Sequence, residues 1–216
     1  MKKLFILMVI ATISTGAFAQ FGITGGATFS TLKFKYKTAG SLNPSIDSKI
    51  GFTLGVFTDV PLSTNFNFRP GLNYTQKGGK ITETVVGGPT ITSTNFKMTL
   101  NYLELPLDFI YKATGGFFVG AGPSLAYLLS GKNKYSDGSP DYKLKIGNDK
   151  TNDDIKAFEF GGNLLAGYQL SNGIFFSVNY NLGFSDLSLQ SEASLKNNYF
   201  GIRVGKKFGN GMMKKK

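Results

Sequence analysis

The chain has 216 residues, with 28 glycines and 20 phenylalanines but no cysteine, histidine or tryptophan. The missing histidine excludes Ser-His and Cys-His catalysis and the usual zinc and copper sites, and the missing cysteine excludes disulfides. The formal net charge is +11, but no basic aromatic motif accompanies it, so we expect no nucleic-acid partner. We also expect no cofactor. Abundant glycine and aromatic residues with few charges favour an all-β fold.

The first 19 residues have the order of a secretory signal peptide. A basic start and the apolar run 4–13 precede an A-x-A motif at 17–19. The run is too short to span a bilayer, and the motif is typical of a cleavage site. We therefore expect a signal peptide at 1–19 and an exported mature chain that begins at Gln20.

Eight segments that alternate apolar and polar residues follow, and each has the length that a tilted strand needs to cross a membrane. They lie at 21–31, 50–60, from 65 onward, up to 112, and at 117–129, 157–170, 174–184 and 198–208. The third and fourth run together into one long hairpin whose tip is VGGP, 86–89. Short and long connectors alternate strictly, as periplasmic turns and outer loops do in an outer-membrane barrel.

The two faces of these segments separate a membrane barrel from a soluble one. In segment 174–184, Phe176 and Val178 share one face, whereas Ser177, Asn179 and Asn181 share the other. A soluble barrel would bury the apolar face and would have no reason to sort its loops by length. We therefore predict an all-β fold: an eight-stranded antiparallel up-and-down transmembrane β-barrel over 20–208, with short periplasmic turns, long outer loops and aromatic girdles.

Segment 101–112, NYLELPLDFIYK, places two acids and a proline among leucines. If the leucines face lipid, Glu104 and Asp108 face the lumen, and Pro106, which has no N–H, lies at a local break in the ladder. A turn centred on Gly87-Gly88 would put Arg69 opposite Pro106 and diagonal to both acids, so we expect Arg69 to be held between them.

The predicted lumen charge cluster consists of Arg69, Glu104, Asp108, Glu159, Arg203 and Lys207. Because an eight-stranded barrel is only wide enough for side chains to fill it, the cluster is interpreted as a plug. A hydrolytic carboxylate pair formed by Glu104 and Asp108 is the weaker alternative, since no cleft is implied.

At these residues the chain resembles a known family. The stretches YTQKG (74–78), YLELPL (102–107) and the glycine-rich GGFFVGAGPSLAYLL (115–129) are similar to those of porin-family, PorT-like outer-membrane β-barrel proteins. The resemblance covers essentially the whole mature chain. It implies an eight-stranded barrel in a Gram-negative outer membrane with a periplasmic N-terminus, and it implies no particular activity.

Other motifs carry less chemistry. The aspartates within 137–154 resemble a calcium loop in composition only, and a solvated loop is the preferred interpretation because lysines dilute them. Lys33, Lys35 and Lys37 alternate at the end of the first segment, where they form either a solvated charge run or contacts to lipopolysaccharide phosphates. Phe208 stands where the assembly machinery reads a terminal aromatic residue, and the basic tail 209–216 follows it.

Three functions remain to be compared. A structural or surface-interaction protein acts through its long loops on an unidentified extracellular ligand, with membrane lipids as partners. A narrow, porin-like channel is the alternative, but it needs an open lumen. An enzyme is not expected, because no nucleophile with a suitably spaced base is present.

Overall fold

The computed structural model describes residues 20–36, 44–87 and 90–208. The strands in these residues are β1 (Gln20–Tyr36), β2 (Ser45–Pro61), β3 (Phe66–Gly87), β4 (Thr90–Lys112), β5 (Phe117–Tyr135), β6 (Tyr142–Lys143), β7 (Phe158–Gln169), β8 (Ile174–Gly183) and β9 (Ala193–Lys207). In the part of the chain thus described, no helix is long and apolar enough to cross a membrane. The predicted signal peptide and tail lie outside the described residues.

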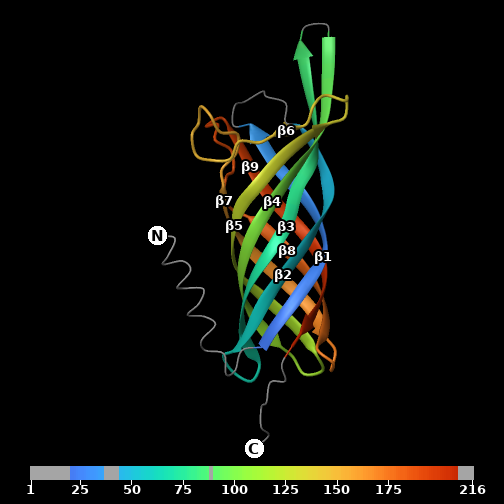
Figure 1. The fold of residues 1–216 in the computed structure, drawn as a ribbon, viewed down its shortest axis with the longest axis vertical. Helices are drawn as coiled ribbons and strands as arrows, with labels where there is room; N and C mark the ends of the chain where they lie inside the picture. Colours follow the sequence, from blue (N-terminus) through green and yellow to red (C-terminus); the bar gives the residue numbers. More distant parts are fainter. Residues whose placement is uncertain (1–19, 37–43, 88–89, 209–216) are drawn as a thin grey trace, which may run out of the picture.

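Eight of the strands form a closed antiparallel ring (Figure 1). Each long strand pairs with its neighbours in the chain, and β1 pairs with β9 to close the circle. The two-residue β6 is attached to β5 above the end of β7, at Lys132 and Asn133. The predicted eight-stranded up-and-down barrel is therefore confirmed, since closure leaves the ring itself without free edges.

Connectors at the two ends of the barrel differ in length as predicted. At one end, residues 62–65, 113–116 and 170–173 join successive strands in short turns. The first residues of β1 and the last residues of β9 also lie at this end, because Gln20 pairs with Asp59 and Gly22 pairs with Lys207. At the other end the β3–β4 hairpin rises past its neighbours (Figure 1). By the rule for outer-membrane barrels, the short turns mark the periplasmic end.

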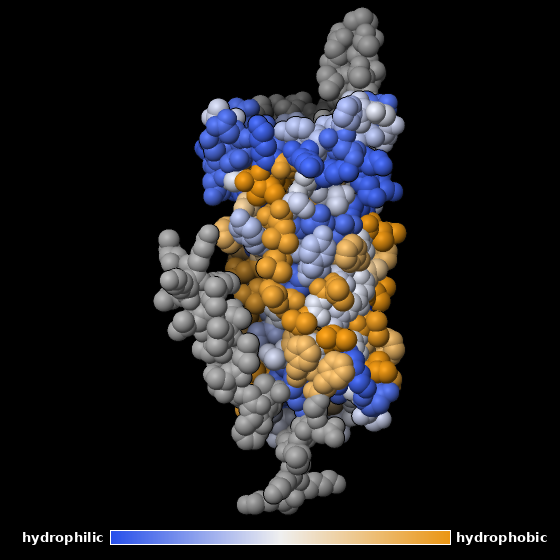
Figure 2. All heavy atoms as spheres, in the orientation of Figure 1, coloured by the Kyte–Doolittle hydropathy of each residue, from blue (hydrophilic) through white to orange (hydrophobic). Residues whose placement is uncertain are grey.

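The outer surface carries the apolar residues of every strand. On β4, Leu103 is 39% exposed whereas the adjacent Glu104 is 1% exposed. Figure 2 shows apolar side chains gathered in a belt on the visible face of the barrel wall, below a hydrophilic extracellular end. Ring contacts between Phe66 and Tyr111 and between Phe117 and Tyr168 lie at the periplasmic edge of this belt. The predicted faces of segment 101–112 are confirmed: Leu103, Leu105 and Leu107 face outward, and Glu104 and Asp108 face the lumen.

The register of the β3–β4 hairpin differs from the predicted one by two residues. Gly87 pairs with Thr90 and Arg69 pairs with Asp108, so the prediction that Arg69 lies opposite Pro106 is wrong. A two-residue shift leaves every side chain on its predicted face, which is why alternation alone could not detect it. The hairpin tip, 88–89, lies outside the described residues.

Pro106 lies at a break in the ladder, as predicted. Pairing of β4 with β3 stops between Pro70↔Leu107 and Asn73↔Glu104. The residue facing the proline is Gly71, where a Cβ would lie 3.3 Å from Pro106 Cγ. Glycine on β3 therefore makes room for the ring, and the break removes the need for the missing N–H donor.

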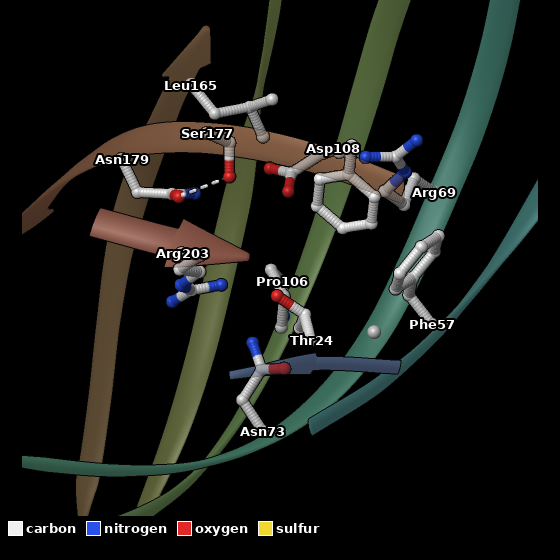
Figure 3. Close-up of a pocket in the computed structure, with 12 residues that line it drawn as sticks. Thr24, Phe57, Arg69, Asn73, Pro106, Asp108, Leu165, Ser177, Asn179 and Arg203 are labelled. Carbon is white, nitrogen blue, oxygen red and sulfur yellow. Dashed lines mark hydrogen bonds between the residues drawn. The ribbon is translucent and has the colours of Figure 1, made fainter. Parts of the chain in front are cut away.

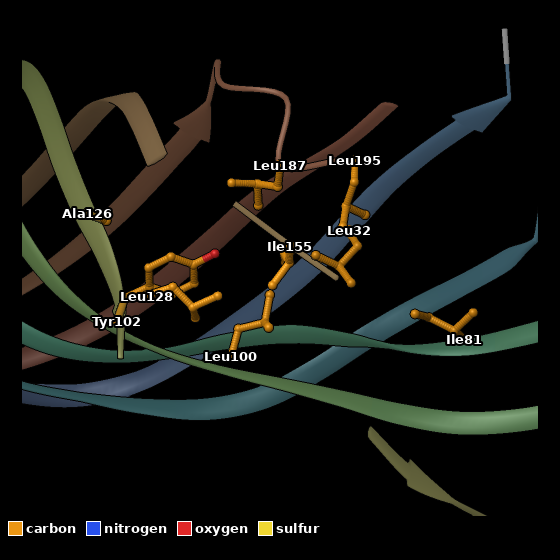
Figure 4. Packing of buried hydrophobic residues seen from close by; sticks show 9 residues of the cluster. All are labelled: Leu32, Ile81, Leu100, Tyr102, Ala126, Leu128, Ile155, Leu187 and Leu195. Carbon is orange, nitrogen blue, oxygen red and sulfur yellow. The ribbon is translucent and has the colours of Figure 1, made fainter. Parts of the chain in front are cut away.

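Two apolar layers fill the lumen near its two ends. The periplasmic layer consists of Phe57, Ile110, Phe118, Leu165 and Phe175. The extracellular layer is larger and contains Leu32, Ile81, Leu100, Tyr102, Ala126, Leu128, Ile155, Leu187 and Leu195 (Figure 4). Ile155 and Leu187 come from the connectors that precede β7 and β9, so these two loops cover the extracellular mouth from inside.

Candidate functional site

The inward residues of β4 cross every layer of the lumen in order. From the periplasmic end they are Lys112, Ile110, Asp108, Pro106, Glu104, Tyr102 and Leu100. A charged layer is thus followed by an apolar layer, a polar centre and a second apolar layer. Because the side chains of a strand alternate between two faces, a single β4 strand contributes to all four.

The charged layer at the periplasmic end surrounds one carboxylate, and we call it the Asp59 cluster. Arg69 donates from Nε to Asp59 Oδ1 at 2.5 Å and from Nη2 to Oδ2 at 2.9 Å. Lys112 Nζ lies 2.9 Å from Asp59 Oδ2, and Lys207 Nζ lies 3.9 Å from the same oxygen. Three cations therefore share one fully buried acid, and the bidentate arginine fixes its orientation.

Arg69 also packs against the periplasmic apolar layer. Its guanidinium carbon lies 4.6 Å from the ring centroid of Phe57, 5.3 Å from that of Phe118 and 5.6 Å from that of Phe175. Cations are attracted to aromatic faces at such distances, more strongly where water is excluded. The arginine thus joins the charged layer to the apolar layer above it.

The polar centre has the opposite composition, and we call it the Lys77 cluster. Lys77 Nζ lies 3.0 Å from Glu104 Oε2 and 2.7 Å from Glu159 Oε1, and its side chain is 1% exposed. The rings of Tyr102 and Tyr199 lie 4.9 and 5.1 Å from the same nitrogen. One buried cation therefore holds two carboxylates that come from β4 and β7.

A hydrogen-bonded chain continues from Glu104 across the lumen. Tyr199 donates its hydroxyl proton to Glu104 Oε1 at 2.7 Å, and Arg203 Nη2 donates to the Tyr199 oxygen at 2.9 Å. Arg203 thus reaches Glu104 through a tyrosine from its own strand, β9. Such buried networks are stable only when most of their members find partners.

Asp108 lies beside a small cavity in the polar centre (Figure 3). Asn163 donates from Nδ2 to both of its carboxylate oxygens at 3.0 Å. The cavity measures about 40 Å³, and its lining includes Thr24, Asn73 and Arg203. At roughly 10–15 Å³ for each water, it holds about three water molecules and no solute of metabolite size.

The predicted charge cluster is divided into these separate groups. The prediction that Arg69 is held between Glu104 and Asp108 is wrong, because its ion pair is with Asp59. Lys207 likewise approaches Asp59 rather than those acids. The acids themselves are buried in the lumen, as are Glu159 and Arg203. Arg69 forms its ion pair with Asp59 because the tight turn at 62–65 places the two residues side by side on adjacent strands.

Three important lumen residues were missed from the sequence: Asp59, Lys77 and Lys112. Each has the parity of an inward position on its strand, so alternation could have found them. The apolar layers were also missed, although doublets such as Phe117-Phe118, Leu164-Leu165 and Phe175-Phe176 interrupt the alternation of their strands. In each doublet one member faces outward and the other lies in the periplasmic layer.

The lysines at the extracellular end of β1 lie on the outside of the barrel. Lys33 and Lys35 are exposed, and Lys33 pairs directly with Lys196 of β9. Lys37 lies outside the described residues. Within the described ranges, no group of acidic residues has the arrangement of a metal site.

Comparison with known proteins places the chain in a family. A model of the outer membrane protein beta-barrel domain matches residues 14–189, whereas no curated protein sequence matches the chain. Ail, the attachment invasion locus protein of Yersinia pestis, is 11% identical with a TM-score of 0.46, over 88% of this chain and 99% of that one. Neisserial surface protein A (NspA) is 14% identical with a TM-score of 0.47, over 88% and 99% of the two chains.

A third solved structure is that of OprG from Pseudomonas aeruginosa. It is 15% identical with a TM-score of 0.45, over 89% of this chain and 97% of that chain. These likenesses concern the fold. The family match covers most of the sequence, and the chain therefore belongs to the outer membrane protein β-barrel domain family, whose members lie in the outer membrane of Gram-negative bacteria.

Proposed function

We propose that this outer-membrane barrel is closed to solutes and acts at the cell surface through its extracellular loops. The observation that carries the proposal is the layered lumen. The polar centre lies between two apolar layers, and the cavity beside Asp108 is only about 40 Å³. A conducting pore needs a continuous wet path, whereas an eight-stranded barrel is narrow enough for side chains to fill.

The extracellular loops support the surface role because they are internally bonded. In the connector between β5 and β7, Asp154 accepts from Lys145 N at 2.7 Å and from Tyr142 Oη at 3.1 Å. Asp153 accepts from Asp149 N at 2.8 Å. A loop held in one shape loses little conformational entropy on binding, which favours recognition of a partner. The same bonds account for these aspartates without calcium.

We also propose that the chain is a porin-family, PorT-like barrel, on the strength of the sequence motifs. The proposal further includes removal of residues 1–19 and contact with the barrel-assembly machinery. It also includes contact of Lys33, Lys35 and Lys37 with lipopolysaccharide phosphates. The exposed Lys33 and the half-buried Lys196 directly opposite it support the last of these. A narrow porin-like channel is the competing function, and an enzymatic role has no support in the lumen chemistry.

Conductance in planar bilayers tests closure. The refolded mature protein is expected to give no steady current, whereas the double variant Ile155→Ser, Leu187→Ser, which loosens the extracellular layer, is expected to give intermittent leak. Steady wild-type current, with ion selectivity that changes in Arg203→Gln, would overturn the proposal in favour of a channel.

A complementation experiment tests the surface role. A deletion strain with an envelope phenotype is expected to be rescued by wild type and by the lumen variant Arg203→Gln. It is not expected to be rescued when the exposed residues 148–152 are replaced by a Gly-Ser segment. Equal rescue by the loop variant, with normal folding, would remove that loop from the proposed function.

A further inference from the structure

Three lysines form a row across the outer wall of the barrel, and we call it the lysine row. On adjacent strands, Lys80 of β3 pairs directly with Lys97 of β4, which pairs directly with Lys134 of β5. All three are exposed and lie on the outward face. Like charges directly opposite one another destabilise a sheet, so a row of three implies a compensating anion.

Among the residues whose side chains the structure describes, acidic residues lie beside this row at its edge. Asp47 of β2 is the Cα partner of Lys80, and Asp141 forms an ion pair with the neighbouring Lys132. Lys97 therefore has lysine on both sides, and no ion pair links it or Lys134 to an acid among the described residues. The centre of the row keeps an uncompensated positive charge.

The position of the row relative to the apolar belt indicates which anion is available. The outward residues Tyr74 and Leu103, with Tyr127 and Leu129 of β5, form the upper rim of the belt on these strands. Figure 2 shows the change from apolar to hydrophilic surface toward this end of the barrel. Six residues separate Leu103 from Lys97, which on a tilted strand places the row on the order of 15 Å above the rim.

An amide ladder fills the interval between rim and row. Gln76 Nε2 donates to Asn101 Oδ1 at 3.1 Å, and Asn101 Nδ2 donates to Ser130 Oγ at 3.0 Å. This band is polar and already satisfied across three strands, as suits a surface that passes from acyl chains to headgroups. Because lysine stems are long and flexible, the ammonium groups of the row can extend along this surface to the headgroup layer.

We propose that the lysine row binds the phosphate groups of a phosphorylated glycolipid in the outer leaflet. Lys97 and Lys134 supply the central charges, and Lys80 supplies the third. This surface lies on β3–β5 and is distinct from both Lys33 on β1 and the loops of the proposed function. A basic cluster beside a membrane attracts anionic headgroups, with each lysine strengthening binding by roughly fivefold.

Binding of purified lipid A to the refolded mature protein, measured by calorimetry in detergent, tests the proposal. The variant Lys97→Gln, Lys134→Gln is expected to bind roughly 10–30-fold more weakly than wild type. The control Lys145→Gln, Lys150→Gln loses the same charge from an extracellular loop and is expected to change binding less than threefold. Dephosphorylated lipid A should abolish the difference between wild type and the row variant.

Two further outcomes decide the matter. Equal weakening in both double variants would show that net charge alone attracts the lipid, and unchanged binding in the row variant would show that the row is solvated. Either result overturns the proposal. Lys97→Arg, Lys134→Arg is expected to retain binding, and heat-modifiable gel mobility confirms that each variant is folded.

Discussion

The two charged clusters of the lumen have inverse compositions. The Asp59 cluster gathers three cations around one acid, whereas the Lys77 cluster gathers two acids around one cation. The Lys112 side chain is 26% exposed, but every ion-paired group around Lys77 is almost fully buried. The excess positive charge of the Asp59 cluster therefore lies where water reaches it. In each cluster the single central charge, Asp59 or Lys77, is the one whose removal should destabilise the barrel most.

This difference shows how a narrow barrel tolerates buried charge. Taking ions out of water costs several kcal/mol each unless geometry and hydrogen bonds compensate. Around Lys77 the compensation comes from residues far apart in the chain, with Tyr199 donating to Glu104. Around Asp59 the bidentate partner, Arg69, comes from the adjacent strand, and the part-exposed Lys112 adds a hydrated cation. The clusters should therefore respond differently to mutation, salt and pH.

Removing the central cation should have the largest effect. Lys77→Met leaves Glu104 and Glu159 close together in a dry interior, and we expect it to destabilise the barrel by about 3–5 kcal/mol. Urea titration of the protein folded in liposomes measures this change. Adding Glu104→Gln and Glu159→Gln to the same variant should recover much of the loss. A cost below about 1 kcal/mol for Lys77→Met alone would mean that water screens the centre as well.

Removing the periplasmic acid should have an intermediate effect that depends on salt. Asp59→Asn leaves three cations, but Lys112 and Lys207 lie near the mouth of the barrel and Arg69 keeps its aromatic contacts. We expect a loss of about 2–3 kcal/mol, the contribution of hydrogen bonds to a charged group. Because the remaining repulsion is screened, stability should partly recover at 0.5 M salt in this variant and not in Lys77→Met. Equal salt responses would contradict the comparison.

Removing one peripheral cation should have a small effect. Lys112→Gln leaves Asp59 with its bidentate arginine, and the lysine is part-exposed, so we expect a loss of less than about 1 kcal/mol. The same urea titration measures it. A loss as large as that of Asp59→Asn would indicate that Lys112, rather than Arg69, is the principal partner of the acid.

The smallest expected effect is a pH response of the loop that covers the Lys77 cluster. Burial raises the pKa of Asp186, but hydrogen bonds from Leu195 N and Ser188 N outweigh it and lower the pKa below its usual value. A lowered folded-state pKa means that the stabilisation is present above the unfolded value and is lost as pH falls through the folded one. The loop carrying Leu187 should therefore loosen only below about pH 4.

Amide exchange at Leu195 measures this loosening. Wild type is expected to lose protection as the pH falls below 4, whereas Asp186→Asn should show weaker protection that does not depend on pH. Pronounced pH dependence in the variant would assign the effect to another group.

The barrel itself could be predicted from local pattern. Alternation in segments such as 174–184 determined which side chains face lipid, because a strand has a period of two. Connector lengths determined which end carries the loops. Residues such as Glu104 and Asp108 could be assigned to the lumen for the same reason, and Pro106 could be assigned to a break because it lacks an N–H.

The partners of the lumen charges could not be predicted in the same way. Alternation fixes a face but leaves the height along the barrel undetermined, since a shift by two residues preserves every face. Arg69 accordingly forms an ion pair with Asp59. Lys77 forms one with Glu159, which lies 82 positions further along the chain. The sequence by itself determined a membrane barrel with acids turned inward. Only the tertiary structure decided which cation each acid contacts: the register of the β2–β3 turn brings Arg69 to Asp59, and closure of the ring brings Lys77 to Glu159, which lies on a strand that is not adjacent in the sheet.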